Sequence, residues 1–304
     1  MNILFVIEQY CDCNPALGLS GPLEYYVHTW RSLNAGPDRV IHYDNLPVEV
    51  TITRVWQECR AQAPDLVLFT EVFNHPSAQI HSLWPKLAAR GISVAAVWHD
   101  SVKGTCRDLP GIRVNILVDT TVPRLRSGLA LWTPHDTALF YGDPKERDLG
   151  FVFPSSKNHK PFVVPYIAAV KSVGLSLLWT GGQREDKLSF EDYARLFGRA
   201  KIILNFAQDI AGMAPQLKGR VTEALYSGAL LLDHRNPHTS QMLADGQEYV
   251  SFDSPDDLVA KATYYLQHEE ERVRIARAGQ ERALQHYSPR AWWQALCAAV
   301  GKAL

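Results

Sequence analysis

Short apolar segments alternate with amphipathic segments along most of this 304-residue chain. The apolar segments are nearly continuous in Val, Ile, Leu and Phe, as expected of parallel strands that helices cover on both faces. In the first half, the pattern predicts strands at 3–7, 40–43, 66–69, 94–98, 115–118 and 130–132, and helices at 23–33, 50–63 and 80–90. This order predicts an α/β fold built on a mostly parallel sheet.

A polar stretch at 141–148 interrupts the alternation, and a second β–α series follows it. The pattern of this second series predicts strands at 149–153, 175–179, 202–206 and 230–233, and helices at 162–173, 190–199, 255–267, 269–286 and 289–303. We therefore predict two Rossmann-like domains, at residues 1–144 and 145–287, that face each other across a cleft. The last helix carries an apolar stripe, so residues 288–304 are expected to cross back and pack on the first domain.

Composition and charge argue against several classes of protein. A hydrophobic content of 46% and a charged content of 21% are typical of a globular protein, and the net charge of −1 provides no field that would attract nucleic acid. The apolar start at 3–7 is too short for a signal peptide or a membrane span. Five scattered cysteines do not form a disulfide framework, which favours a reducing cytoplasm. Cys11 and Cys13 have no second pair at zinc spacing, so no metal site is expected.

The segment 218–229 has the composition of a loop, a short helix and a turn into a buried strand. Lys218 and Arg220 lie at the expected helix entrance, Glu223 follows one turn later, and Gly228 ends the helix. Cations at a helix N-terminus can neutralise a diphosphate, and a carboxylate can accept hydrogen bonds from a ribose diol. An exposed ion pair between Arg220 and Glu223 explains the same spacing.

Other polar residues stand where predicted strands end. Gly21 belongs to a glycine-containing loop before the first helix, and His99 follows the strand at 94–98. In the second half, Ser155 and Lys157 follow one strand and Asn205 lies at the end of another. Open α/β domains bind ligands at the carboxyl ends of their strands, so these side chains are candidates for the same site. A histidine that only caps its strand is the alternative for His99.

The region 188–287 resembles the group 1 glycosyltransferases of the two-domain GT-B fold, in particular their spore-maturation-protein-like branch. The matching motifs run in order from Leu188–Tyr193 through Lys201–Phe206, Lys218–Ala224 and Gly228–Leu232 to Asp256–Gly279. The first half matches in architecture, in the loop that contains Gly21 and in the Trp98–Asp100 strand end.

This resemblance implies a hexosyltransferase that moves a sugar from a nucleotide-diphosphate donor, with UDP as the expected nucleotide, to an acceptor hydroxyl. It implies retention of the anomeric configuration, no metal and no cofactor besides the nucleotide-sugar. The donor contacts expected from the residues and the resemblance are Gly21, Ser155, Lys157, Asn205, Lys218, Arg220 and Glu223, with His99 and Arg220 as catalytic residues. Lys218 and Arg220 would bind the diphosphate and Glu223 the ribose.

One position departs from the family pattern. Many relatives carry an acid that contacts the donor sugar eight residues before the position of Glu223, and this chain has Pro215 there. Two alternatives follow: a nucleotide-sugar-binding protein without catalysis, which Pro215 favours, and a nucleotide-sugar 2-epimerase, which would need acid/base carboxylates in the cleft. The acceptor, protein partners and oligomeric state cannot be read from these residues.

Overall fold

The computed structural model describes residues 1–70, 76–98, 108–118, 125, 127–155, 161–180, 188–206, 208 and 215–304. The chain forms two compact units, one of Met1–Asp136 with Pro289–Leu304 and one of Thr137–Ser288. The sequence predicted a division after residue 144. The second unit begins earlier because the short helix α4 (Thr137–Phe140) packs against α6 (Phe190–Arg199) and α7 (Arg220–Ser227) of that unit.

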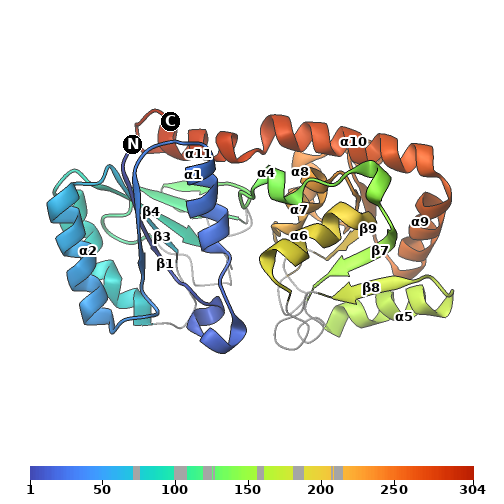
Figure 1. The fold of residues 1–304 in the computed structure, drawn as a ribbon, viewed down its shortest axis with the longest axis horizontal. Helices are drawn as coiled ribbons and strands as arrows, with labels where there is room; N and C mark the ends of the chain where they lie inside the picture. The colour runs from blue at the N-terminus through green and yellow to red at the C-terminus, as the bar shows by residue number, and fades with distance from the viewer. Residues whose placement is uncertain are drawn as a thin grey trace. The chain divides into compact units, whose positions relative to one another are not determined.

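The first unit is built on one parallel sheet of six strands in the order β2-β1-β3-β4-β5-β6. Figure 1 labels three of them, β1, β3 and β4. The strands are β1 (Ile3–Ile7), β2 (Asp38–His42), β3 (Leu66–Thr70), β4 (Ser93–Trp98), β5 (Val114–Leu117) and β6 (Gly128–Ala130). Side chains of β1 and β3 are buried throughout, which explains their continuous apolar sequences.

Helices cover both faces of this sheet. One face packs against a π-helix at Leu23–His28, the following α1 (Thr29–Ser32) and the C-terminal α11 (Pro289–Ala299). Trp292 and Trp293 of α11 are fully buried there, and the Trp293 indole N–H donates to Thr29 Oγ1 at 3.1 Å. The other face packs against α2 (Val48–Gln62), a 3-10 segment at Pro76–Leu83 and α3 (Trp84–Ala88). The C-terminal helix thus completes the core of the first unit.

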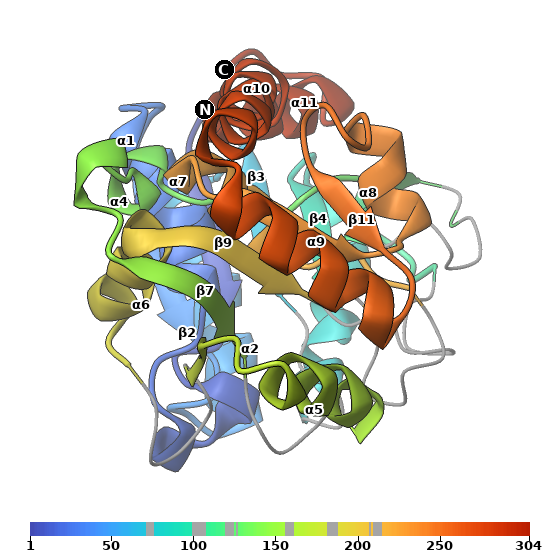
Figure 2. The same cartoon turned by 90° about the vertical axis from the view of Figure 1, so that its right-hand side faces the viewer.

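The second unit contains a parallel sheet of five strands in the order β11-β10-β9-β7-β8. Figure 2 labels three of them, β7, β9 and β11. The strands are β7 (Leu149–Pro154), β8 (Leu177–Thr180), β9 (Ala200–Asn205), β10 (Leu230–His234) and β11 (Val250–Phe252). The helices besides α4, α6 and α7 are α5 (Val164–Ser172), α8 (Pro237–Met242), α9 (Pro255–Gln267) and α10 (Glu269–His286).

Alternate residues of these strands form a core with α5, α9 and the start of α10. The residues between these core positions point to the other face of the sheet. Ile203 of β9 and Leu231 of β10, which lie opposite each other, are examples and are also buried. α6 and α7 pack against β9, against strands on either side of it and against each other, and we place them on that second face. Because all strands of each sheet are parallel, their carboxyl ends meet at one edge, which is where polar groups gather in the second unit.

The predicted two-sheet α/β fold is confirmed. The helix expected at 23–33 begins as a π-helix, the helix at 80–90 begins as a 3-10 segment, and β6 forms at Gly128–Ala130 instead of 130–132. The shift in β6 follows from its edge position, because its pairing with β5, and not an apolar sequence, defines the strand. None of the described helices is long and apolar enough to cross a membrane.

Candidate functional site

Two neighbouring strands of the second unit end in polar side chains that bond to each other. Asn205 ends β9 and lies opposite Asp233 of β10, and its Nδ2 donates to Asp233 Oδ1 at 2.9 Å. Arg220, the first residue of α7, donates from Nη1 to Asn205 Oδ1 at 2.7 Å. Asn205 and Asp233 are completely buried. Because Asn205 accepts from one partner and donates to the other, its amide orientation is fixed, and the Arg220 guanidinium is fixed with it.

Arg220 is held on a second side by an aromatic ring. Its guanidinium carbon lies 5.8 Å from the centre of the Phe153 ring, near the end of β7. Its Nε is buried and has no hydrogen-bond partner among the described residues. A guanidinium carries five N–H donors in a rigid fork, so a group that is already positioned and still has donors to offer suits a phosphate.

Glu223 lies one turn further along α7 and is 3% exposed. The Tyr193 hydroxyl of α6 donates to Glu223 Oε2 at 2.9 Å. Burial raises the pKa of Glu223 to about 7, against the opposing effects of the Arg220 charge and the Tyr193 hydrogen bond. This burial contradicts the interpretation of Arg220 and Glu223 as an exposed ion pair, because residues Val221 to Ser227 of α7 are all buried.

Lys218 precedes α7 by two residues, and its ammonium group contacts the buried Gln216 side-chain oxygen. The Gln216 backbone carbonyl in turn accepts from Asn236 Nδ2 at 2.8 Å. Asn236 caps α8 by accepting from the His238 backbone N–H at 3.0 Å. The loop that carries Lys218 is therefore fastened to the beginning of α8, which keeps a second cation near the start of α7.

Ser155 follows β7 at the same edge of the sheet and is 6% exposed. Its backbone N–H donates to Thr180 O at 2.9 Å, and its backbone carbonyl accepts from Trp179 Nε1 at 3.0 Å. Its contact with a donor stays a prediction. Lys157 lies outside the described residues.

In the first unit, Gly21 lies directly against the ring of Tyr25. A Cβ at this position would lie 2.3 Å from the Tyr25 ring, and Gly21 O accepts from the Tyr25 N–H at 2.9 Å. The preceding Ser20 donates from Oγ to Glu8 Oε1 at 2.9 Å. The close approach of a ligand to Gly21 therefore stays a prediction. His99 lies outside the described residues.

Sequence reasoning missed several polar residues of this edge. Tyr193 lay inside a motif that matched the family, and Asp233 was a charged residue at the end of an apolar run, but neither pattern indicated their partners. A further polar chain, described below, includes Tyr166, Gln208 and His234. Among the described residues, no group of His, Cys, Asp and Glu could hold a metal ion.

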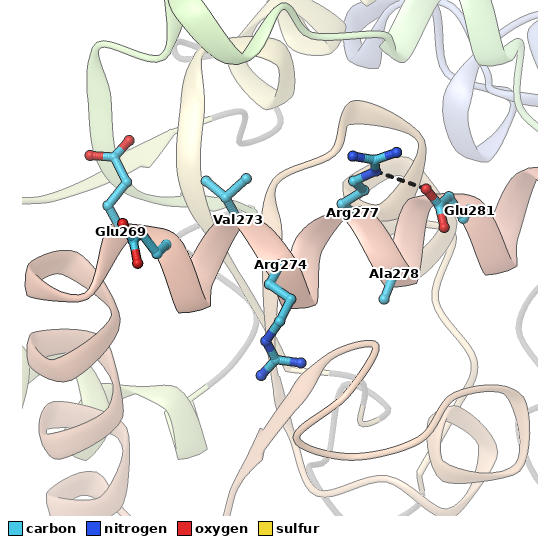
Figure 3. A pocket seen from close by; sticks show the side chains of 7 residues that line it. Glu269, Val273, Arg274, Arg277, Ala278 and Glu281 are labelled. Carbon is cyan, nitrogen blue, oxygen red and sulfur yellow. Dashed lines mark hydrogen bonds and ion pairs between the residues drawn. The ribbon is translucent and has the colours of Figure 1, made fainter.

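A depression of about 720 Å³ lies over α10 (Figure 3). Glu269, Glu270, Val273, Arg274, Arg277, Ala278 and Glu281 line it, all from one helix, and Arg277 Nε pairs with Glu281 Oε1 at 2.8 Å. One helix provides every wall of this depression, and some of its charged side chains neutralise each other. It therefore does not have the convergent polar groups that surround the start of α7.

Comparisons with known proteins bear on the fold of the chain and on the family that its second half resembles. Residues 166–298 match a family model described as glycosyl transferase-like. No curated protein matches the sequence. Similar solved structures include sucrose-phosphate synthase from Thermosynechococcus elongatus, with a TM-score of 0.70 and 12% identity over 97% of both chains.

Two further structures cover almost the whole chain. Anabaena HepE, solved in complex with UDP and glucose, has a TM-score of 0.65 and 12% identity over 98% of this chain and 99% of its own. AviGT4, a glycosyltransferase involved in avilamycin A biosynthesis, has a TM-score of 0.64 and 13% identity over 99% and 98%. The chain therefore has the GT-B fold of these structures, and its residues 166–298 are similar to the glycosyl transferase-like family.

Proposed function

We propose that this protein is a hexosyltransferase that moves a sugar from a UDP-sugar to an acceptor hydroxyl. The observation that carries the proposal is the pairing of a positioned cation with a buried carboxyl group one turn apart on α7. Arg220 keeps a buried donor, Nε, that bonds to none of the described residues, and Glu223 is 3% exposed beside Tyr193. A nucleoside diphosphate presents the two matching groups, an anion and a hydroxyl donor pair, in close succession.

Arg220 and Lys218 act on the diphosphate. Negative charge grows on the leaving nucleotide as the bond to the sugar breaks, and fixed N–H donors stabilise that charge without reorganising. Asn205 and Phe153 hold the guanidinium before substrate arrives, so the donors are already aimed. With these cations in place, the reaction proceeds without a metal ion, and a phosphate oxygen of the leaving group takes the proton of the acceptor hydroxyl with retention of configuration.

Glu223 acts on the ribose. Its carboxylate accepts hydrogen bonds from the 2′ and 3′ hydroxyls, and Tyr193 keeps one oxygen oriented while the site is empty. The pKa of about 7 means that the group ionises near neutral pH, and hydroxyl donors favour the ionised form. Ribose binding and ionisation of Glu223 are thus coupled.

The remaining assignments belong to the same proposal. Gly21, Ser155, Lys157 and Asn205 complete the donor contacts, with Asn205 acting through Arg220. His99 acts on the donor sugar or the acceptor. The first unit, Met1–Asp136 with Pro289–Leu304, holds the acceptor. The protein belongs to the spore-maturation-protein-like branch and works in the cytoplasm.

Pro215 favours a second candidate, a nucleotide-sugar-binding protein without catalysis. Titration of UDP against the parent protein and Arg220→Lys tests the shared binding step. We expect UDP to bind the parent and to lose about tenfold in affinity with the lysine, which keeps the charge and loses the fork. Equal affinities would contradict the phosphate role of Arg220, and turnover of the donor then separates a transferase from a binding protein.

A further inference from the structure

A second chain of hydrogen bonds lies at the carboxyl edge of the second unit. Gln208 Nε2 lies 2.7 Å from His234 Nδ1, and His234 Nε2 lies 3.0 Å from the Tyr166 hydroxyl. The Tyr166 hydroxyl lies 3.1 Å from the backbone carbonyl oxygen of Asp253. His234 is the last residue of β10 and directly follows Asp233. This chain therefore passes through the residue next to the Asn205–Asp233 pair that holds Arg220.

The backbone carbonyl of Asp253, at the end of this chain, determines the direction of the hydrogen bonds before it. A carbonyl oxygen only accepts, so the Tyr166 hydroxyl donates to Asp253 and accepts from the N–H at His234 Nε2. Burial lowers the pKa of His234, which keeps the ring neutral at pH 7 and makes Nδ1 an acceptor. The Gln208 amide must therefore present its NH₂ group to His234, and this leaves the amide oxygen on the other side.

That oxygen is buried and accepts no hydrogen bond from any residue that the structure describes. Gln208 Oε1 has no hydrogen-bond partner in the part of the chain that the structure describes, while the NH₂ group of the same side chain is held by His234. A buried acceptor without a donor costs roughly as much as a lost hydrogen bond, and such groups are rare in native proteins. A site that keeps an acceptor in this state is complementary to a ligand that supplies a hydroxyl or an N–H group.

Aromatic rings connect Gln208 to the Arg220 site. Arg220 lies over Phe153, the Phe153 and Phe206 ring centres are 5.4 Å apart, and Phe206 stacks on His234 at 5.9 Å. Gln208 and Arg220 are thus attached to opposite ends of one packed cluster. Glu223 bonds instead to Tyr193 of α6, whereas Tyr166 belongs to α5.

We propose that Gln208 binds the sugar that is transferred, with its side-chain oxygen accepting a hydrogen bond from a sugar hydroxyl. The inference rests on the proposed function, because it takes the diphosphate to lie at Arg220. With the ribose at Glu223 on the α6 side, the sugar at the other end of the diphosphate extends towards the Gln208 side. A phosphate offers only acceptors to this oxygen, whereas a sugar offers several hydroxyl donors. Pro215 pairs directly with Gln208 in an isolated antiparallel bridge.

The test compares the affinities of UDP and UDP-glucose in three proteins: the parent, Gln208→Met and Gln208→Glu. Both substitutions remove the NH₂ group that donates to His234 Nδ1. Methionine also removes the acceptor oxygen, whereas glutamate keeps an oxygen at the same place, so the difference between the two variants reports on the oxygen. We expect Gln208→Met to bind UDP like the parent and to lose about tenfold in UDP-glucose affinity. We expect Gln208→Glu to retain the parent ratio of UDP-glucose to UDP affinity. Thermal unfolding of each variant checks that the fold is intact.

The outcomes separate this inference from the proposed function. If the parent binds neither ligand, the proposed function fails. If the parent binds both and Gln208→Met leaves the ratio of UDP-glucose to UDP affinity unchanged, the assignment of Gln208 is overturned. If Gln208→Met weakens UDP as much as UDP-glucose, the residue serves the nucleotide, and the assignment to the sugar is overturned as well.

Discussion

Substitution of Glu223 by Gln should change stability and nucleotide binding in opposite directions. The carboxyl group is buried, and its pKa in the folded protein is about 7 against an ordinary value of 4.5. A raised pKa means that the folded state binds the proton more tightly than the unfolded state. The stability contributed by this group is therefore fully present below pH 4.5 and is lost as the pH rises through 7.

The size of the effect follows from the difference between the two pKa values. A difference of about 2.5 pH units corresponds to about 3 kcal/mol of stability lost when Glu223 is fully ionised. Glutamine never ionises, so Glu223→Gln should be more stable than the parent at pH 8.5, by up to about 3 kcal/mol. Near pH 4.5 both side chains are neutral, and the two proteins should unfold at similar urea concentrations.

Binding should respond in the other direction. A carboxylate accepts hydrogen bonds from ribose hydroxyls more strongly than an amide, and hydrogen bonds to charged groups contribute about 1.5–3 kcal/mol. We expect Glu223→Gln to lower UDP affinity at pH 8 by about 10- to 100-fold. With 2′-deoxyuridine diphosphate, which lacks one hydroxyl, the difference between parent and variant should be clearly smaller.

Urea unfolding at pH 4.5 and 8.5, together with calorimetric titration of both nucleotides, measures these quantities. Tyr193→Phe serves as a control, because it removes the hydrogen bond to Glu223 and keeps the carboxyl group. It should raise the pKa of Glu223 further and reduce UDP affinity less than Glu223→Gln does. A Glu223→Gln protein that is less stable than the parent by the same amount at both pH values, with unchanged UDP affinity, would refute the reasoning.

Four further predictions concern other residues. Arg220→Ala should weaken UDP binding by about 2–5 kcal/mol in calorimetric titration, and unchanged affinity would remove Arg220 from the phosphate site. His99→Ala should reduce donor turnover more than UDP affinity, whereas a variant with full activity per folded molecule would indicate a strand-capping role. Chelation by EDTA should leave turnover intact, so loss of activity that added Mg²⁺ restores would contradict a metal-free reaction. Trp293→Ala should destabilise the first unit by about 3–5 kcal/mol because its side chain is fully buried, and unchanged unfolding would contradict its place in that core.

The fold could be predicted because its strands carry their own signal. Buried parallel strands such as β1 and β3 are apolar at every position except the last residue of β3, Thr70, so their existence and their parallel pairing follow from sequence. β6 and the start of the helix at Leu23 could not be placed to the residue, since edge pairing and π-helical hydrogen bonds leave no apolar pattern.

The candidate site could be predicted where residue type and local spacing decide the chemistry. Arg220 and Glu223 stood one turn apart at a helix entrance, and the burial of Glu223 distinguishes a site from a surface ion pair. Tyr193 and Asp233 could not be assigned, because their partners lie 30 and 28 residues away and depend on strand order. The unpartnered oxygen of Gln208 depends on an amide orientation that only the hydrogen-bond chain through Tyr166 determines.

Release of UDP from UDP-sugars tests the central claim, that the protein transfers a sugar and does not merely bind its donor. Parent protein and Glu223→Gln would be incubated with UDP-glucose, UDP-galactose and UDP-N-acetylglucosamine, with water as the acceptor, and UDP would be followed by phosphorus NMR. We expect the parent to release UDP from at least one donor faster than the protein-free control, and Glu223→Gln to release it more slowly. Binding of the donors without any release above the control would contradict the account and favour a nucleotide-sugar-binding protein.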